Sequence, residues 1–515
     1  MADLKLLPYP PDLAADQQEQ LINTVTDWLI AHGFFAPRKS GTDKTQPTIR
    51  VPSSLSLIPV TLFPSLFPRT CFHDAIEIQP EFNKLYAAVA ADEDWLSAVI
   101  QDEFADSDEF IKKLWSVHLA VKSEGYVQDT TITLARSDYL LSTDQLENSR
   151  PLTIKQVEFN GISSFGGSAH SIAELHSHLY NIGMSQPSQG LNADQSSFPP
   201  NPSLKGLCAG LLAAHTIYGD PKSGCATKIG ILLIAQPVEW NIYEHRRIQY
   251  FLWSQDPAVP IYSLPLSSVL DKTTVTDSRH LLYTPNPEAE TIEISVVFFR
   301  GGHDAEDYTS AIEWEARRHL ERSFAIKCPS ILTQIACTKK VQQLLAKDSN
   351  LKRFVSDASS LRLKETFMEM YPLGAQTADG QKGRQLALDP KSACGYVLKP
   401  QRECGGHNIY GEAIPAYLNT LPESQWRSYI LMRLIKPPCL RNVILRNGEP
   451  ATESIINELG VYGTCIWRAT RQANNLDIMY NGNAGWLVRT KNRAHAEGGI
   501  GAGFGSFDSL FLVDD

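Results

Sequence analysis

The segments KIGILLIAQ (228–236) and TIEISVVFFR (291–300) decide the class of fold. Each is a short, largely apolar run, and such runs are typical of strands buried on both faces of a sheet. Helical patterns lie between and after them, including DYTSAIEWEARRHLERS (307–323). The alternation of strand and helix predicts an α/β unit over about residues 225–330.

Other patterns extend outward from this unit. Helical periodicity over residues 21–30, followed by Gly33, predicts an N-terminal helix, and residues 110–121 predict a second one that includes a packed His118. The stretch 181–206 is the best linker candidate, and residues 371–395 are expected to be a loop-rich stretch. A largely antiparallel sheet is predicted from GYVLK (395–399), SYILMRLI (428–435), NVILR (442–446), VYGTCIW (461–467) and GWLVRT (485–490).

Composition excludes several classes of protein. Of the 515 residues, 43% are hydrophobic, and the net charge of −10 gives no electrostatic case for binding nucleic acid. No apolar run is long enough to span a membrane, and the N-terminus has no signal-peptide pattern. None of the nine cysteines forms a CxxC, which argues against a zinc ribbon or a disulfide scaffold. We therefore expect a soluble, reduced, cytoplasmic protein.

The segment GYVLKPQRECGGHNIYGE (395–412) has features of a phosphate-binding turn. An apolar strand leads through Lys399 to the adjacent Gly405 and Gly406, which allow backbone N–H groups to approach phosphate oxygens closely. A surface hairpin with a Gly-Gly turn is the competing interpretation. GxxxxGK[ST] occurs nowhere, so the segment is not a P-loop. Cys404 beside His407 suggests a structural cysteine more than a nucleophile, because no third, orienting group can be identified.

The segment KQVEFNGISSFGGSAHSIAELH (155–176) suggests a metal site. Glu158 and Asn160 are two residues apart, so on a strand they share one face, and Mg²⁺ prefers such hard oxygen ligands. The Ser/Gly loop that follows leads into a helix at about Ser168, whose N-terminus is a natural anion site. An amphipathic edge strand followed by a capped helix explains the segment equally well.

The C-terminal segment GWLVRTKNRAHAEGGIGAGFGSFDSL (485–510) combines two cations with a glycine run. Arg489 and Lys491 project together from a strand, which favours a bound anion. The run GIGAGFG (499–505) lacks the GxGxxG spacing, and too little chain remains for a βαβ unit. A glycine-rich terminal loop is the alternative. Hydrolase motifs of the GxSxG and HExxH types are absent.

Three segments together resemble one family. EFNGISSFGG (158–167), LKPQRECGGHNIYGE (398–412) and VRTKNRAHAEGGIGAGFG (488–505) resemble, in the same order, signature segments of the eukaryotic glutathione synthetase family of ATP-grasp ligases. Further similar stretches include RSDY (136–139), EWNIYEHR (239–246) and WEARRHLERSFAIKCPSILTQIACTKKVQQ (314–343). The resemblance runs from about residue 55 to the C-terminus.

The resemblance implies both architecture and chemistry. The fold would be α/β (α+β), an ATP-grasp architecture with an inserted α/β substrate-binding domain and a mobile lid. Residues 1–224 would form the N-terminal part of the core with the magnesium and substrate strand-loop, residues 225–335 the substrate-binding domain, and residues 336–515 the nucleotide-binding part and lid. A homodimer would use ATP and Mg²⁺ to phosphorylate the carboxylate of γ-glutamylcysteine, and the amine of glycine would then attack the acyl phosphate.

Residue roles implied by the resemblance fall into four groups. The catalytic residues are Arg136, Lys339, Lys399 and Arg489. The metal ligands are Glu158, Asn160 and Glu403. The nucleotide contacts are Glu158, Lys339, Lys399, Glu403, Cys404, Gly405, Gly406, His407, Asn408, Tyr410, Met432, Arg433, Leu434, Ile435, Glu458, Lys491 and Glu497. The substrate contacts are Arg136, Ser163, Ser164, Glu239, Asn241, His245, Arg300, His303, Arg489, Ile500 and Gly501.

The chain departs from the family pattern mainly on the substrate side. His245 and His303 stand where the family has Gln and Tyr, Trp240 replaces an Arg, and the serine loop after Asn160 is one residue shorter. Cys404 and His407 replace a Gly and an Asn of the phosphate loop. The alternative hypothesis is therefore a paralogous ATP-grasp amide ligase that joins a different acid and amine. A third hypothesis is a non-catalytic ATP-binding homologue. The retained magnesium-binding and phosphate-binding residues argue against this hypothesis.

Overall fold

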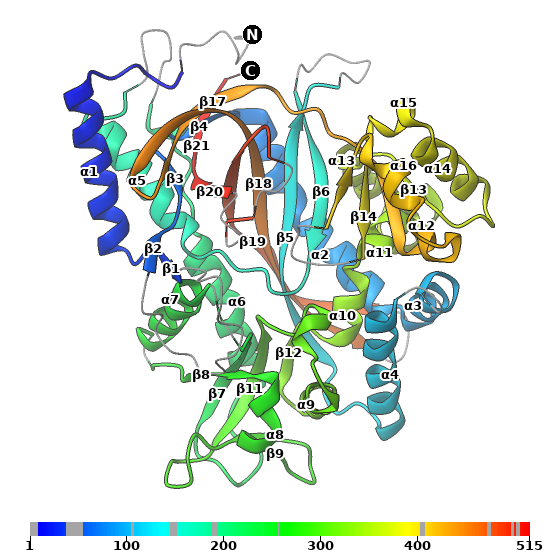
Figure 1. Ribbon diagram of the computed structural model, residues 1–515. Coiled ribbons are helices and arrows are strands. Elements are labelled where there is room, and N and C mark those ends of the chain that lie inside the picture. Colours follow the sequence, from blue (N-terminus) through cyan, green and yellow to red (C-terminus); the bar gives the residue numbers. More distant parts are fainter. Residues whose placement is uncertain are drawn as a thin grey trace.

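The computed structural model describes residues 9–37, 55–104, 108–144, 152–186, 194–237, 239, 241–255, 257–401, 407–470, 475–495, 499–500 and 505–514. Within these ranges the chain forms one large mixed sheet of thirteen strands, a separate four-stranded sheet and two short strand pairs (Figure 1). The mixed α/β architecture predicted from the sequence is confirmed. The predicted domain boundaries stay a prediction.

The middle of the large sheet consists of β5 (Thr130–Ser142), β18 (Glu449–Thr470) and β19 (Asn475–Asn492), and β6 (Thr153–Asn160) pairs with β5. Side chains alternate between the faces of a strand. Leu459 and Val461 of β18 accordingly join a core with helix α2 (Arg69–Ala91), whereas Tyr462 and Ile466 join another with α6 (Ser203–Tyr218). We refer to these two sides of the sheet as the α2 face and the α6 face.

One edge of the large sheet closes on itself. β20 (Gly505–Asp508) pairs with β19 and with β3 (Val60–Thr61), β3 pairs with β17 (Leu440–Arg446), and β17 pairs in turn with β18. Beside this edge, β4 (Ser65–Pro68) lies parallel to the C-terminal strand β21 (Leu510–Val513). The C-terminal strands therefore lie against residues 60–68, far away in the sequence (Figure 1).

The other edge contains the parallel strands that the two apolar runs predicted. β7 (Ile229–Ala235) lies between β8 (Ile261–Pro265) and β11 (Ile292–Phe299), and β12 (Ile326–Cys328) joins β11 to β5. Every residue of β11 is buried, as expected for a strand covered on both faces. Helices α7 (Ile242–Trp253) and α9 (Ala311–Glu321) follow β7 and β11, which confirms the alternation.

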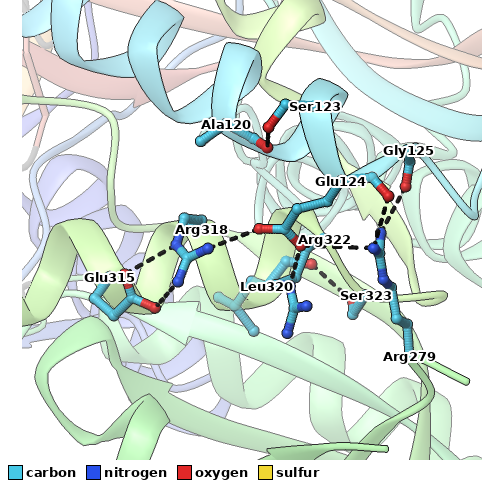
Figure 2. Close-up of polar contacts among 10 residues, drawn as sticks. All are labelled: Ala120, Ser123, Glu124, Gly125, Arg279, Glu315, Arg318, Leu320, Arg322 and Ser323. Carbon is cyan, nitrogen blue, oxygen red and sulfur yellow. Dashed lines mark hydrogen bonds and ion pairs between the residues drawn. The ribbon is translucent and has the colours of Figure 1, made fainter. Parts of the chain in front are cut away.

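An arginine cluster joins this part of the molecule to helix α4 (Glu109–Glu124). The Glu124 carboxylate accepts hydrogen bonds from Arg318 at 2.7 Å and Arg322 at 2.6 Å (Figure 2). Arg279, from the turn between β9 (Thr273–Val275) and β10 (Leu281–Tyr283), donates to the carbonyl oxygens of Glu124 and Gly125. The cluster therefore caps the C-terminus of α4 with cations, a favourable placement for the helix dipole.

The small sheet corrects one sequence expectation. β13 (Met370–Pro372), β16 (Tyr429–Arg433), β14 (Tyr396–Pro400) and β15 (Ile409–Tyr410) form it, in that order. The predicted loop-rich stretch 371–395 instead contains helices α14 (Ala378–Leu388) and α15 (Pro390–Ala393). Gly380 and Gly383 suggested a loop, but they lie in α14, where a Cβ on Gly383 would come within 2.4 Å of the Pro372 carbonyl oxygen. Gly383 thus allows α14 to pack closely against β13, and Gly380 leaves room for the Gly374 carbonyl oxygen.

The expectation of a single antiparallel sheet for residues 395–490 was also wrong in part. The strands pair antiparallel, but β14 and β16 belong to the small sheet, whereas β17, β18 and β19 belong to the large one. The reason is that a strand pattern carries no information about which non-local partner the strand finds.

The remaining elements are mostly helical. The predicted N-terminal helix is α1 (Ala15–Ala31), and Gly33 follows it with a φ of 68°. His118 on α4 is fully buried, as predicted. The other elements are β1 (Phe35–Pro37), β2 (Leu55–Leu57), α3 (Glu93–Val99), η1 (Ile100–Phe104), α5 (Ala169–Asn181), η2 (Gln195–Ser197), η3 (Leu266–Ser268), α8 (Val269–Lys272), η4 (Ala305–Asp307), α10 (Ile331–Ala336), α11 (Lys339–Leu345), α12 (Asp348–Phe354), α13 (Asp357–Thr366), α16 (Ala413–Leu418) and η5 (Glu423–Ser428). No helix in the described ranges is long and apolar enough to cross a membrane.

Candidate active site

A charged cluster lies on the α6 face of the large sheet, where three neighbouring strands bring charged side chains together. β5 contributes Arg136 and Asp138, β18 contributes Glu458, and β19 contributes Arg489. The register places Glu458 opposite Arg489 and Asp138 opposite Gly460. A Cβ on Gly460 would come within 2.7 Å of the Arg136 side chain, so glycine is needed there for Arg136 to lie across the sheet.

Asp138 is the centre of this cluster and has no exposed surface. Its carboxylate accepts two hydrogen bonds from Arg136, at 2.5 and 2.8 Å, and one from Arg489 at 2.9 Å. Asn160 Nδ2 donates to the same group at 3.0 Å, and Arg489 also pairs with Glu458. Asp138 is not among the site residues predicted from the sequence, although the RSDY spacing places it on the same strand face as Arg136.

Glu158 faces two lysines that come from other parts of the chain. Lys339 Nζ, at the start of α11, lies 3.6 Å from Glu158 Oε2, and Lys399 Nζ of β14 donates to the Val157 carbonyl oxygen at 2.9 Å. Burial alone would raise the pKa of Glu158, but Lys339, Lys399 and the two arginines lower it to about 2. Burial lowers the pKa of Lys399, and the Glu158 charge opposes this. The carboxylate is therefore ionised at neutral pH.

The charged side chains around Asp138 and Glu158 could bind an anion together with a hard metal cation. Three carboxylates, on Asp138, Glu158 and Glu458, face four cations, on Arg136, Lys339, Lys399 and Arg489. The sites of the two lysines and the two arginines are well matched to phosphate and carboxylate oxygens.

The predicted magnesium ligands fit a hard dication in their chemistry. Glu158 offers an ionised carboxylate, and Asn160 keeps its amide oxygen as an acceptor because its Nδ2 donates to Asp138. In the described ranges, no three His, Cys, Asp or Glu side chains gather in a group that could hold a metal ion. The predicted magnesium ligands do not form such a group, because Asn160 is an amide and Glu403 lies outside the described residues.

An apolar cluster lies on one face of the small sheet, where Met370, Met432, Val397 and Tyr410 are neighbours in register. Met368, Val397 and Met432 are its buried members, and Met370, Tyr410, Leu434 and Ile435 pack against it. Val397 and Lys399 are two residues apart on β14, so they share a strand face. The apolar cluster and the Lys399 side chain therefore lie on the same face of the small sheet.

The predicted substrate residues form a second polar group beside the charged cluster. Ser163, which has a φ of 56°, donates to the Arg300 carbonyl oxygen at 2.7 Å, and the Arg300 guanidinium donates back to the Ser163 carbonyl oxygen. Ser164 donates to the carbonyl oxygen of Asn160 at 3.0 Å, which links this loop to the metal strand. The serine loop and Arg300 are thus held together.

Two histidines in this second group are largely buried and lie near carboxylates. His245 Nε2 lies 3.3 Å from Glu239 Oε2, and His303 Nδ1 lies 3.6 Å from Asp307. Burial lowers the pKa of His245 well below its usual value, and burial raises the pKa of Glu239. Asn241 donates its backbone N–H to Glu239 at 2.9 Å. At neutral pH His245 is an uncharged imidazole that can donate one hydrogen bond and accept another.

The anion site expected at the start of α5 is already filled by the protein. The helix begins at Ala169 after Ser168, as predicted. However, the Ser168 N–H points to the carboxylate of Glu244 on α7, at 3.2 and 3.3 Å from its two oxygens. A side-chain carboxylate thus supplies the negative charge that a helix N-terminus favours, and the site is a helix cap.

The other predicted site residues are distributed around these groups. Asn408 Nδ2 contacts the Tyr410 hydroxyl at 3.5 Å, Arg433 Nη2 lies 3.8 Å from Asp144, Lys491 is paired in register with Ile456, and Ile500 packs on the core of the α6 face. His407 is exposed. Glu403, Cys404, Gly405, Gly406, Glu497, Gly501 and the departure Trp240 lie outside the described residues.

Comparisons with known proteins give matches over nearly the whole chain. The family described as eukaryotic glutathione synthase, ATP binding domain, matches residues 15–512. The glutathione synthetase large chain of Schizosaccharomyces pombe is 33% identical, over 97% of this chain and 98% of its own length. Glutathione synthetase of Homo sapiens is 34% identical, over 96% and 97% of the two chains.

A solved structure has the same fold. A glutathione synthetase-like effector of Globodera pallida, in its apo form, superposes with a TM-score of 0.71 at 19% identity and covers 98% of this chain and 99% of its own. At that identity the likeness concerns the fold alone. The full-length sequence matches are what decide membership: this chain belongs to the eukaryotic glutathione synthetase family of ATP-dependent ligases, as its three signature segments predicted.

Proposed function

We propose that the protein joins γ-glutamylcysteine and glycine to form glutathione, with cleavage of ATP to ADP and phosphate. The observation that carries this proposal is the charged cluster around Asp138, in which cations for phosphate and carboxylate groups converge beside an ionised Glu158. The full-length relatives named glutathione synthetase support the choice of substrates.

In the proposed reaction the substrate carboxylate attacks the terminal phosphoryl group of ATP, which gives an acyl phosphate and ADP. The amine of glycine then attacks the acyl carbon, the C–N bond forms, and phosphate leaves. Phosphoryl transfer depends mainly on positioning and charge neutralisation. Lys339 and Lys399 would bind the transferring phosphoryl oxygens, and Arg136 and Arg489 would hold carboxylate oxygens in line with them.

ATP and Mg²⁺ have distinct places in this proposal. The adenine ring would lie in the apolar cluster around Met432, with its phosphates toward Lys399. Glu158, Asn160 and Glu403 would hold Mg²⁺, which neutralises phosphate charge when bound. The nucleotide contacts would be completed by Tyr410, Glu458, Lys491 and Glu497. Residues 404–408 and 433–435 would surround the nucleotide.

The peptide substrate would lie against the second polar group. Arg300 and the serine loop of Ser163 and Ser164 would bind its carboxylate and backbone, and Glu239 and Asn241 its amino group. Ile500 and Gly501 would close over the substrates. His245 and His303 stand where the family pattern has other side chains, which favours one second candidate: a paralogous ligase for a different acid and amine. Sites that hydrogen-bond specific groups can reject an analogue by about 10⁴-fold.

We also propose that the protein is a cytoplasmic homodimer. Tyr250 and Trp253 on α7 are 58% and 49% exposed, and Ile30 at the end of α1 is 52% exposed. These segments are neighbours, since Arg247 of α7 donates to the His32 carbonyl oxygen. An exposed apolar surface of this kind supports self-association. Sedimentation of the wild type and of Trp253→Asp tests the assignment, because a monomeric wild type would contradict it.

The substrate assignment is tested by product analysis. Purified protein is incubated with ATP, Mg²⁺ and a panel of acids and amines, and products are measured by mass spectrometry alongside phosphate release. The expected result is glutathione, with one phosphate per molecule. Efficient ligation of another pair, with γ-glutamylcysteine and glycine left unused, would identify the paralogous ligase instead.

A further inference from the structure

Asp508, at the end of β20, forms a second polar centre that the charged cluster does not include. The side chain is fully buried. Its Oδ2 accepts hydrogen bonds from the hydroxyl of Thr490 on β19 at 2.6 Å and from Asn457 Nδ2 on β18 at 3.2 Å. Asn457 Nδ2 also donates to Thr490 Oγ1 at 2.9 Å. One carboxylate thus ties together three adjacent strands.

The same carboxylate also reaches strands outside the site. Its Oδ1 accepts from the hydroxyl of Thr61 on β3 at 2.7 Å and from the Ser509 N–H at 2.7 Å, and Oδ2 also accepts from the hydroxyl of Ser65 at 2.6 Å. All five donors are neutral groups. Burial raises the pKa of Asp508 to about 6, although these hydrogen bonds lower it. The neighbouring His176 is neutral at pH 7, because burial lowers its pKa to about 4.

The strand register places this centre directly behind the nucleotide side of the active site. Thr490 lies between Arg489 and Lys491 on β19, and Asn457 precedes Glu458 on β18. Since side chains alternate, Thr490 and Asn457 point to the α2 face while Arg489 and Glu458 point to the α6 face. The hydrogen bonds to Asp508 therefore fix the backbone positions from which the charged side chains project.

A buried carboxylate at position 508 lowers stability relative to an apolar side chain that would pack equally well. Burying a charged group is unfavourable unless it is fully hydrogen-bonded, and a set of donors that satisfies it has one arrangement. Thr490, Asn457 and Asp508 must all be in register for the bonds to form. The free-energy cost of burying Asp508 is understandable if the register of these strands determines activity.

We propose that Asp508 is a positioning residue for the reaction, which acts through Thr490 and Asn457 to hold Arg489, Lys491 and Glu458 in register against the nucleotide. The inference rests on the proposed function for its reaction. Positioning errors of about 1 Å can lower turnover by about 10²-fold, so the loss of one of these bonds has a measurable effect.

The chain offers a matched pair of variants. Thr490→Val and Thr61→Val each remove one hydroxyl that donates to Asp508, at 2.6 and 2.7 Å, and both threonines are fully buried. Only Thr490 lies on a strand that carries site residues. Thr490→Ser keeps the hydroxyl and serves as the conservative variant. Thermal unfolding of all three reports any loss of stability that a purely structural role would cause.

The expected result is that Thr490→Val raises the KM for ATP and lowers kcat/KM by about tenfold. Thr61→Val and Thr490→Ser should stay within about twofold of wild type, with similar unfolding temperatures for the two valine variants. Equal kinetic effects of Thr490→Val and Thr61→Val, or no effect of either, would overturn the proposal.

A second readout separates this inference from the proposed function. Isothermal titration with a non-hydrolysable ATP analogue and Mg²⁺ measures nucleotide affinity without either substrate. A wild type that binds the analogue but makes no glutathione would contradict only the substrate assignment. Unchanged affinity of Thr490→Val for the analogue, together with unchanged kcat/KM on whichever pair the wild type ligates, would contradict the positioning role of Asp508.

Discussion

The substitution Asp138→Asn removes the charge at the centre of the active-site cluster while keeping the side-chain shape. Wild-type Asp138 accepts three hydrogen bonds from two guanidinium groups, at 2.5, 2.8 and 2.9 Å. In the variant, one carboxylate oxygen becomes an NH₂ donor that faces these cations. Removing one partner of a buried ion pair costs about 3–5 kcal/mol.

The expected magnitude lies at the lower end of that range. The side chains of Arg136 and Arg489 are 13% and 23% exposed, so water partly solvates them, and Arg489 keeps its ion pair with Glu458. We therefore expect the free energy of unfolding to fall by about 3 kcal/mol. The kcat/KM for the carboxylate substrate should fall by about 10²-fold, because the charged pairing that orients both arginines is weakened.

Glu293→Gln is the control for this experiment. Glu293 is also fully buried, but it accepts from Tyr218 and from the backbone N–H groups of Lys222 and Ser223, outside the active-site cluster. Urea unfolding and phosphate release are measured for both variants. The reasoning about Asp138 is refuted if Asp138→Asn retains the wild-type kcat/KM, or if Glu293→Gln lowers kcat/KM as strongly.

Three further variants test the residues proposed for the nucleotide and the metal. Lys399→Met should leave the fold intact and lower phosphate release by about 10²–10³-fold, because one charge facing the phosphoryl group is lost; wild-type release would remove the phosphate role. Glu158→Gln should raise the Mg²⁺ concentration needed for half-maximal turnover, and an unchanged titration would exclude a metal role. Because the pKa of Glu158 is lowered to about 2, its stabilising effect is present above about pH 4.5 and is lost as the pH falls toward 2. The difference in unfolding free energy between wild type and Glu158→Gln should therefore shrink on acidification below pH 4.5, and a constant difference would contradict the pairing with the lysines. Met432→Ala should raise the KM for ATP several-fold with little change in kcat, and an equal fall in kcat would argue against a role in ground-state nucleotide binding.

Local patterns in the sequence predicted much of the fold. The apolar runs of β7 and β11 and the periodicity of α1 and α4 depend on side chains close in sequence, and the structure confirms them. The helix α14 was missed because Gly380 and Gly383 are typical of loops. In the structure, Gly383 is required by the close approach of β13, a contact with another element that the local pattern does not reveal, whereas a Cβ on Gly380 would meet the Gly374 carbonyl oxygen. Sheet membership of β14 and β16 was missed for the same reason.

The candidate site shows a similar division. Glu158 and Asn160 could be selected from their two-residue spacing on a predicted strand, and the strand is present as β6. Asp138 has the same spacing from Arg136, but its central position depends on Arg489, which lies 351 residues away in sequence. The filled N-terminus of α5 could not be predicted either, because Glu244 is 76 residues from Ser168.

The central claim is that the carboxylate is activated by phosphorylation before the amine attacks. The most direct test uses γ-glutamylcysteine labelled with ¹⁸O in the reacting carboxylate, together with ATP, Mg²⁺ and glycine. One carboxylate oxygen should be transferred to the released phosphate, because the acyl phosphate breaks at its carbon–oxygen bond when the amine attacks. Mass spectrometry of the phosphate should therefore show one ¹⁸O per molecule of glutathione. Unlabelled phosphate, or ¹⁸O found in AMP, would contradict the account.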